Sequence, residues 1–487
     1  MKRFLGPLAL SLAAAACGAP ASGPAPATPA DLALTHVTVV DVESGALRAD
    51  QTVLVRGSRI AWAGPAGEAR VPAGARVVDA TGRYVIPGLW DMHVHTSREG
   101  RALHFWPQFL AYGVTGVREM GSYLDSLQHW RAQARRPGSG APRIVYSSPM
   151  LDGSPTSWRH GYAVADSAAA VAAVDTMQAL GFDFLKVYNR LSRDAYFAIA
   201  RRARERGIPF AGHIPQSVTA TEASDAGQRS IEHLSNDFYL NCVPGGGALL
   251  ARFLAARAPG APADSVGPAL NRLLDAMLAG PVPASCQPLW NRMAANGTWL
   301  TPTLTVSRGQ QPPDALVRDP RLRFVPPALA ARWDSGRPTG EDAVREERIA
   351  ARRAQMVALA HAAGVGILAG TDASDEPYVF AGSGLHDELA LLVDAGLTPL
   401  QALRAATLNP ARYLGAADSM GTVAAGKAAD LLVLDANPLQ DIRNTMRIFA
   451  VVAGGRLIDA AERERLLTLA QQEASRAVNA PPARQDD

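Results

Sequence analysis

Two histidines and an aspartate alternate in the stretch IPGLWDMHVHT, which spans residues 86–96. In a strand, residues i and i+2 point to the same face, so His93 and His95 would project together near the strand end. Asp91 stands two positions earlier in the same apolar run. A single buried histidine is often a hydrogen-bonded core residue, but two imidazoles at this spacing indicate metal ligands.

Four more polar residues close short apolar stretches further along the chain. Lys186 lies in FLKVY, His213 in AGHIP, His233 in IEHLS and Asp372 in LAGTDAS. A charged lysine is costly to bury in such a strand unless it is modified or bound to metal. Each residue has a structural explanation when taken alone, such as a helix cap for Asp372. Together with the two histidines, their shared place at strand ends indicates one site.

The elements that would position these residues alternate between strand and helix. Stretches rich in Ala, Leu and Arg separate most of the short apolar segments, which span residues 115–120, 143–148, 183–188, 210–214, 230–234, 298–304 and 366–372. Strands that alternate with helices form a parallel sheet, and a strand near residue 88 brings their number to eight. We therefore expect an α/β fold, a (β/α)8 TIM barrel with its active site at the carboxyl ends of the strands.

Both ends of the chain differ from this middle part. Residues 32–84 and 416–460 contain short runs of Val, Ile and Thr broken by Gly, Asp and Ser. Such runs predict strands, and their place at both ends predicts one small β-sandwich domain built from the two. The barrel that carries the candidate metal site would occupy residues 85–415, and residues 461–487 would form a C-terminal helix and tail.

The first residues are expected to direct export. MKRFLGPLALSLAAAAC combines a basic start, an apolar run of about a dozen residues and small residues, which is too short for a membrane span. Residues 1–17 resemble a lipoprotein signal peptide in which Cys17 is lipidated, although no Leu lies three positions before it. Cleavage nearby and free export is the alternative. Residues 18–31 would form a flexible linker.

By the sorting rules that this resemblance implies, Gly18 favours the outer membrane. The protein would then be an outer-membrane lipoprotein on the periplasmic side of a Gram-negative bacterium, attached to the membrane only through its lipid. In that oxidising compartment Cys242 and Cys286 are a candidate disulfide, with two free thiols as the alternative.

Charge excludes one class of partner. The chain has 487 residues and a formal net charge of +3, which falls to +1 without Lys2 and Arg3. Lysine and arginine are not clustered, so no nucleic-acid partner is expected.

The whole set of motifs resembles the amidohydrolase superfamily over nearly the entire exported chain. VVDATGRYVIPGLWDMHVHT matches the approach to the first barrel strand, LTPLQALRAATLNPARYLG matches the connecting helices, and GTVAAGKAADLLVLDANP matches the return to the sandwich. Within the superfamily the chain is similar to the imidazolonepropionase-like, prolidase-like branch, which includes Xaa-Pro dipeptidase-like members. In binuclear members a strand-four lysine is carboxylated by CO2, and the carbamate bridges two divalent metal ions.

The resemblance implies a role for each residue. Two divalent ions, with zinc as the expected metal, would be held by His93, His95 and Asp372 on the more buried side and by His213 and His233 on the other. Lys186, as N6-carboxylysine, would bridge them together with a hydroxide. Neutral imidazoles and carboxylates suit zinc, and two metals lower the pKa of a bridging water. Asp372 would accept its proton and pass it to the departing amine.

The resemblance also narrows the reaction. Mononuclear deaminases and imidazolone hydrolases of the superfamily carry an acid three residues after the strand-five histidine, where this chain has Gln216. They also lack the bridging lysine. Both departures argue against deamination and against imidazolone hydrolysis. Lys186 instead indicates hydrolysis at a binuclear metal site, which in this branch implies metal-dependent cleavage of the amide C–N bond of a dipeptide or an N-acyl amino acid. A lactonase or phosphoesterase on the same site and a non-catalytic binding relative are the alternatives.

The carboxylate of such a small-molecule substrate requires cationic or hydroxyl donors. Candidates near the strand ends are Arg118, His160, Tyr188 and His386. Arg118 would otherwise form an ion pair within the barrel, Tyr188 would pack as an aromatic residue, and His386 would cap the following helix. The sequence leaves open whether the protein forms a homo-oligomer.

Overall fold

The structure of the protein is a computed structural model. It describes residues 30–97, 102–136, 138–234, 245–256, 262, 265–279, 282, 284–373 and 376–476. The expected signal segment with Cys17, most of the expected linker, and Cys242 lie outside the described residues. Within the described ranges, no helix is long and apolar enough to cross a membrane.

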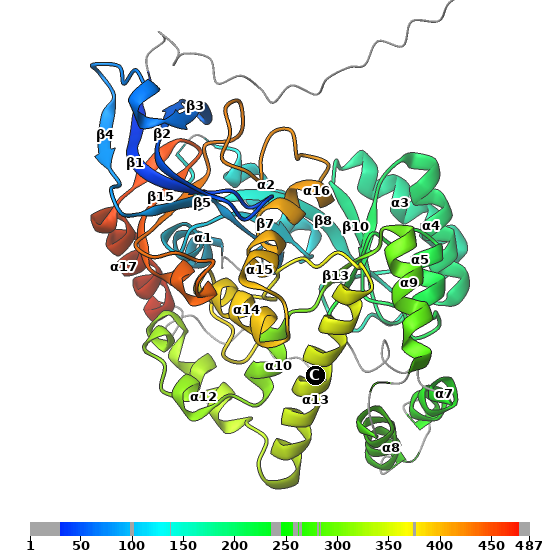
Figure 1. The fold of residues 1–487 in the computed structure, drawn as a ribbon. Coiled ribbons are helices and arrows are strands. Elements are labelled where there is room, and N and C mark those ends of the chain that lie inside the picture. The colour runs from blue at the N-terminus through cyan, green and yellow to red at the C-terminus, as the bar shows by residue number, and fades with distance from the viewer. Residues whose placement is uncertain are drawn as a thin grey trace, which may run out of the picture.

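Parallel strands form the barrel that carries the expected site (Figure 1). In sheet order they are β6 (Leu89–Val94), β7 (Val114–Glu119), β8 (Arg143–Asp152), β10 (Phe184–Val187), β11 (Phe210–Gly212), β12 (Ser230–Glu232) and β13 (Trp299–Thr301). Each neighbouring pair is parallel, and β9 (Gly161–Ala163) adds to the edge of β8. The expected TIM barrel is confirmed.

The segment expected as the eighth strand closes the barrel through isolated bridges. Ile367 bridges to β13 and Ala373 bridges to β6. The backbone passes close to its neighbour at Gly370, where a Cβ would lie 2.9 Å from the Cβ of His93. Asp372 then adopts a φ of 60°, and its N–H donates to the carbonyl of His93 at 2.7 Å. The irregular backbone therefore places Asp372 beside the first strand.

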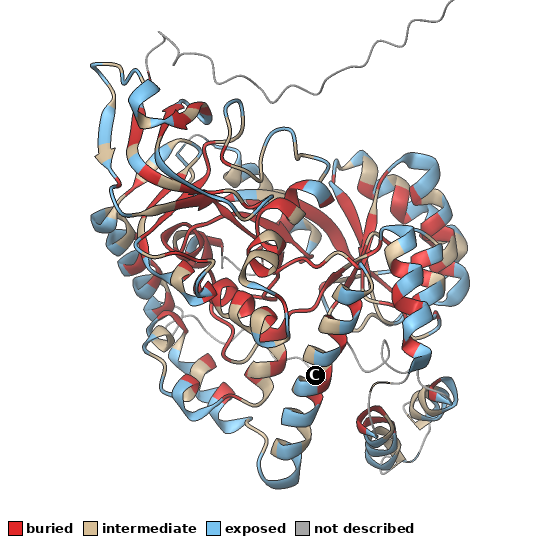
Figure 2. Ribbon diagram, in the orientation of Figure 1, coloured by how far each residue is buried: buried red, intermediate tan, exposed pale blue. Residues whose placement is uncertain are grey.

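Helices surround the barrel, and buried residues concentrate on the strands and on the helix faces turned toward them (Figure 2). The helices that follow successive barrel strands include α1 (Ala102–Ala111), α2 (Leu124–Ala134), α3 (Ser167–Ala179), α4 (Arg193–Arg206), α5 (Ala220–Asp225), α9 (Gln287–Asn296), α10 (Leu304–Gln310) and α14 (Ser383–Asp394). The sequence of α4 explains its limits. The hydroxyl of Ser192 accepts from the N–H of Ala195, and Gly207 ends the helix with a φ of 66°. Buried Tyr196 and Ile199 share the inward face.

Two insertions add helices outside this repeat. The first carries α7 (Gly246–Ala256) and α8 (Val266–Leu278), and the second carries α11 (Asp314–Val317), α12 (Pro327–Ser335) and α13 (Gly340–Ala362). After α14, α15 (Pro399–Ala405) and α16 (Leu408–Tyr413) lead to the second sheet. Cys286, just before α9, is buried and disulfide-bonded. Because Cys242 is not among the described residues, its pairing with Cys286 stays a prediction.

Both ends of the chain meet in a second, separate sheet, as expected. Its order is β16 (Arg456–Ile458), β15 (Ile448–Ala453), β14 (Leu431–Leu434), β5 (Tyr84–Pro87), β1 (Leu32–Val40), β2 (Leu47–Arg56) and β3 (Arg59–Pro65), with β4 (Arg76–Asp79) also paired to β1. The antiparallel pairing of β14 with β5 joins the two ends. Since β5 leads directly into β6, this sheet fixes where the first ligand strand begins. The final helix, α17 (Ala460–Arg476), packs on α1.

Candidate metal centre

The predicted ligands converge at the carboxyl ends of the barrel strands. Ligand atoms of His93, His233 and Asp372 all lie within 4.8 Å of one another. The Nε2 of His95 lies 3.4 Å from Oδ1 of Asp372, and the ring of His213 lies 4.9 Å from that of His233. The carboxylate of Asp372 therefore lies among imidazoles from the ends of β6 and β12, and His213 lies beside His233.

Lys186 lies in the same region, within β10 and beside β11. Its side chain is fully buried, with Nζ 6.0 Å from the centre of the Tyr188 ring. After the larger effect of burial, its charge lowers the pKa of His93, His213 and His233. The six residues that the sequence grouped are thus neighbours in space.

The four histidines share one hydrogen-bonding pattern. In each, Nδ1 contacts an oxygen of the surrounding protein, with distances of 2.8, 2.7, 2.9 and 2.6 Å for His93 to Glu232, His95 to the Gly121 carbonyl, His213 to Asn189 and His233 to Thr303. An oxygen acceptor at Nδ1 favours the tautomer whose Nε2 carries the free lone pair. Metal-binding histidines are commonly oriented in this way by a partner on the other ring nitrogen.

The chemistry of the donor set fits a divalent metal. Among the described residues, the buried Nε2 of His93 has no hydrogen-bond partner. It lies 3.5 Å from Oδ1 of Asp372, and the Nε2 of His233 lies 3.8 Å from Oδ2. Imidazole nitrogen and carboxylate oxygen are the ligands that zinc and similar ions take in proteins.

Burial also sets the protonation of these ligands. Burial first, and the Lys186 charge second, lowers the pKa of His93 and His213 well below the ordinary value. The same causes lower the pKa of His233 to about 3. Burial therefore favours the neutral form of His93, His213 and His233, which is the form of histidine that binds metal.

Arg118 lies below this centre, in the barrel interior, rather than beside a substrate. It is fully buried, and its Nη2 donates to both carboxylate oxygens of Glu232 at 2.8 Å. Its Nε donates to the carbonyl of Met92, and its Nη1 donates to Ser230 and Tyr413. The expectation that Arg118 contacts the substrate is corrected. Arg118 instead forms an ion pair with Glu232, and Glu232 contacts Nδ1 of His93.

His386 is also away from the centre. It lies on α14 with 2% of its surface exposed, and its Nε2 donates to the carbonyl of Tyr112 at 2.8 Å. Its Nδ1 lies 2.9 Å from the hydroxyl of Thr445. One ring nitrogen thus joins α14 to the turn between α1 and β7, and the other joins it to the connection between β14 and β15. The expectation that His386 contacts the substrate is corrected.

His160 and Tyr188, the other two candidate substrate residues, belong to a group of side-chain rings that reaches His213. The Tyr188 ring lies 4.2 Å from that of His213, and its hydroxyl accepts from the indole N–H of Trp158 at 2.8 Å. His160 stacks on Trp158 and contacts the ring of Tyr123. Both predicted substrate residues therefore belong to a connected group of rings.

Asp91, the third polar residue of the opening stretch, supports the site from behind. Its carboxylate accepts from the N–H of Thr371 at 2.9 Å and from the Thr371 hydroxyl at 2.6 Å. It also accepts from the N–H of His93 at 3.2 Å. Burial raises the pKa of Asp91 to about 7. Asp91 thus holds the turn that presents Asp372.

Backbone strain concentrates at the same place. Of the six non-glycine residues with positive φ in the described ranges, three are His233, Thr303 and Asp372, at 64°, 47° and 60°. Such conformations cost free energy and gather at functional sites. Their clustering here shows that the fold imposes the backbone conformation of this part of the candidate site.

Sequence reasoning missed Arg353, a cation at the rim beside His233. Its Nε donates to the carbonyl of Leu234 at 2.9 Å and its Nη1 donates to the hydroxyl of Ser307 at 2.9 Å. Burial lowers the pKa of Arg353. The available signal was its place near the buried stripe of α13, which includes Ile349, Met356 and Val357.

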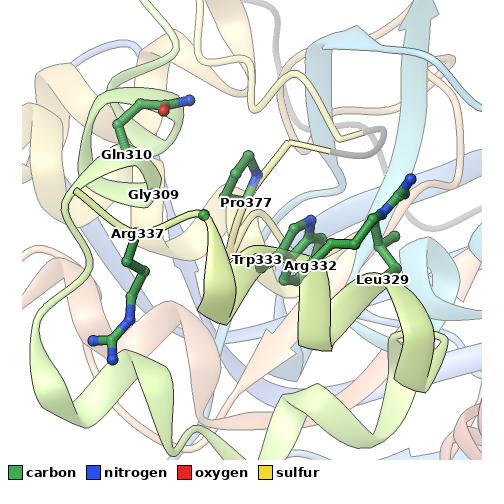
Figure 3. A pocket seen from close by; sticks show the side chains of 8 residues that line it. Gly309, Gln310, Leu329, Arg332, Trp333, Arg337 and Pro377 are labelled. Carbon is green, nitrogen blue, oxygen red and sulfur yellow. The ribbon is translucent and has the colours of Figure 1, made fainter.

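A separate pocket lies between α10, α12 and the segment after Asp372 (Figure 3). It has a volume of about 180 Å³ and is lined by Gly309, Gln310, Leu329, Arg332, Trp333, Gly336, Arg337 and Pro377. Figure 3 shows the side chains of Arg332 and Arg337 extending away from one another, so they do not form a joint anion site. None of the predicted metal ligands lines this pocket.

Comparison with known proteins supports the same reading of the fold. Bottromycin amidohydrolase has a TM-score of 0.70 and 25% identity, with 92% of this chain and 91% of that chain covered. A Xaa-Pro dipeptidase with bound methionine in its active site has a TM-score of 0.62 and 20% identity, with 88% of this chain and 100% of that chain covered. The second likeness bears on the fold alone.

Curated relatives match over shorter stretches. An adenine deaminase of Mesorhizobium japonicum is 42% identical over 67 residues, which are 14% of this chain and 11% of that protein. An adenine deaminase of Chelativorans is 30% identical over 196 residues, 38% of this chain and 32% of that protein. The chain therefore matches less than two thirds of the length of either relative.

The family comparison covers the whole site. The amidohydrolase family model matches residues 84–458. This range contains the six predicted metal ligands and the point where β5 of the second sheet leads into β6 of the barrel. Because this match covers most of the sequence, the chain belongs to the amidohydrolase family.

Proposed function

We propose that the chain is a metal-dependent hydrolase of carbon–nitrogen bonds that cleaves the amide of a dipeptide or an N-acyl amino acid. The observation that carries this proposal is the pattern of four histidines gathered at one end of the barrel, each with its Nδ1 atom in contact with an oxygen of the surrounding protein. Asp372 stands among them as the anionic ligand. Membership of the amidohydrolase family supports the same reaction class.

Two divalent ions, zinc by donor chemistry, would be held by His93, His95 and Asp372 and by His213 and His233. Lys186 would contact both as a carbamate. Only three of the chain's 48 basic residues are lysines, and Lys186 is the fully buried one among those described. An arginine cannot form a carbamate, so a buried amine in an arginine-rich chain favours this modification. The neutral amine attacks CO2, an N–C bond forms and one proton is released.

Side chains of the protein would then transfer the protons and bind the substrate. Bound metal ions lower the pKa of a water molecule and polarise a carbonyl. Asp372 would take the proton of the attacking water and deliver it to the departing amine nitrogen. The guanidinium of Arg353 would bind the substrate carboxylate through the terminal nitrogen that has no described acceptor.

A substrate screen with metal analysis tests the proposal. Purified protein should hold about two divalent ions per chain and hydrolyse dipeptides or N-acyl amino acids in proportion to that content. The same panel should contain adenine, lactones and phosphotriesters. Release of ammonia from adenine with no amide cleavage would replace this function by deamination, and turnover without bound metal would exclude it.

We expect Arg353→Met to weaken recognition of the substrate carboxylate. The KM of an N-acyl amino acid should rise about tenfold or more, because a charge-assisted hydrogen bond is lost, while kcat changes little. The methyl ester of the same substrate should be affected much less. Arg348→Met, on the exposed face of the same helix, is the matched control. Equal losses on acid and ester would assign Arg353 a structural role.

We also propose that the protein is a lipoprotein on the periplasmic side of the outer membrane. The basis is the signal-like segment that ends at Cys17. Cys17→Ser should move the protein from the membrane fraction to the soluble periplasmic fraction, because a lipid chain is required for anchoring. Fractionation of cells and mass spectrometry of the N-terminus measure this. A wild-type protein that is already soluble would favour free export.

A further inference from the structure

Four aromatic side chains line one side of the mouth of the metal centre. Tyr123 follows β7, Trp158 and His160 follow β8, and Tyr188 follows β10. These three strands are neighbours in the barrel, and the next strand along ends at His213. The rings therefore form a continuous series from the surface to a predicted metal ligand.

Contacts along this series are direct. The ring centres of Tyr123 and His160 are 5.6 Å apart, and those of His160 and Trp158 are 6.1 Å apart in a stacked arrangement. The indole N–H of Trp158 donates to the hydroxyl of Tyr188, whose ring lies 4.2 Å from that of His213. Trp158 is thus one aromatic ring away from the metal centre.

Trp158 is exposed and yet held in place. The residue is 54% exposed, while its indole N–H donates to the hydroxyl of Tyr188. Its carbonyl accepts from the hydroxyl of Thr156 and from the N–H of Gly161, both at 2.8 Å. A single exposed apolar residue on a surface is ordinary. One that is anchored by its polar atoms and still more than half exposed, next to a group of rings that reaches a predicted metal ligand, is suited to bind a ligand.

The loop that carries Trp158 is tied to the barrel. The buried carboxylate of Asp152 accepts from the N–H groups of Gly153, Ser157 and Arg190 at 2.9, 2.6 and 2.6 Å. The Arg190 guanidinium donates to the carbonyl of Thr156 at 3.3 Å. A pre-ordered aromatic surface binds at low entropic cost, since little of its freedom remains to be lost.

Arg353 lies on the other side of the centre. Its partners, Leu234 and Ser307, follow β12 and β13, whereas Trp158 follows β8. Counting the segment that closes the barrel, β8 and β13 occupy the third and seventh of eight positions, which face one another. A substrate with its carboxylate at Arg353 therefore has its acyl side at Trp158.

We propose that Trp158 is a specificity-determining residue that binds a flat, apolar acyl group of the substrate. The preferred substrates are then amides whose acyl part carries an aromatic ring, and whose amine part carries a carboxylate. This inference rests on the proposed amide hydrolysis. It adds a substrate class that neither the metal ligands nor the family assigns.

Three substrates separate the outcomes: N-acetylglycine, N-phenylacetylglycine and N-acetylphenylalanine. In wild-type protein, N-phenylacetylglycine should have the highest kcat/KM of the three. Trp158→Ala should lower that value by about tenfold or more, because the stacking surface is removed. The values for the other two substrates should change less than about twofold, and metal content should stay constant. Trp158→Phe should restore most of the preference.

Val77→Ala is the matched control, because Val77 is 56% exposed on the distant β4 and should leave all three values unchanged. An equal loss on all three substrates in Trp158→Ala would assign Trp158 to loop structure and overturn the proposal. A loss confined to N-acetylphenylalanine would also overturn it, since the ring would then bind on the amine side.

Calorimetric binding of the products separates this inference from the amide proposal. Wild-type protein should bind phenylacetate more tightly than acetate, and Trp158→Ala should bind the two alike. If no amide is hydrolysed but this preference is present, amide hydrolysis fails and the Trp158 surface stands. If amides are hydrolysed with no such preference in turnover or binding, the Trp158 proposal alone fails.

Discussion

Lys186→Ala should remove metal binding and turnover together. If Lys186 contacts both metal ions as a carbamate, its loss takes an anionic ligand from each ion at once. Activity should fall by at least about 10²-fold, because the metals that activate water and polarise the carbonyl are lost. Metal analysis, melting temperature and turnover on one preparation measure this result.

Small carboxylic acids provide a sharper test of the same position. Formate or acetate can occupy the space that the shortened side chain leaves and can offer two oxygens to the metals. Either acid should restore part of the metal content and activity of Lys186→Ala. Lys427→Ala is the control, because Lys427 is the other described lysine and its Nζ donates to the carbonyl of Ala417 at 2.8 Å, outside the barrel. A metal-loaded, active Lys186→Ala protein without added acid would disprove the bridging role.

Asp372→Asn should separate chemistry from metal binding. The amide keeps the shape of the side chain and one weak metal contact, but it does not accept the proton of the attacking water. Turnover should fall by roughly 10²-fold or more, the typical contribution of a general base. Much of the metal should remain, since four histidines still provide ligands.

A structural role for these residues predicts another pattern. A buried lysine that only balances an aspartate would give two unstable variants, whose activity falls in step with the amount of folded protein. Comparison of melting temperature with turnover per folded molecule distinguishes the two cases. Near-normal turnover in folded Asp372→Asn would remove Asp372 from proton transfer.

The identity of the ligand set could be predicted from the sequence. Strand residues at i and i+2 share a face, which paired His93 with His95 before any tertiary information. The alternation of strands and helices placed Lys186, His213 and His233 at ends of parallel strands, and such ends meet at one rim. Both inferences use only local periodicity and the direction of the chain.

The depth at which each side chain lies along the barrel axis was decided by the tertiary structure. Arg118 also lies near the end of a strand, but the register between β6, β7 and β12 places it beneath the ligands, against Glu232. His386 opens a helix after the last barrel segment, yet helix packing turns it toward Tyr112 and Thr445. Strand order and stagger arise from pairing between distant segments, which local sequence does not specify.

Contacts between distant loops were likewise set only by the fold. Arg353 reaches the site from the middle of α13, 120 residues after His233, and Trp158 lies against Tyr188 although 30 residues separate them. The sequence by itself determined which residues are candidate metal ligands, because that chemistry depends on residue type and strand period. The tertiary structure decided which other residues lie near them, because long-range packing brings distant loops to the same rim.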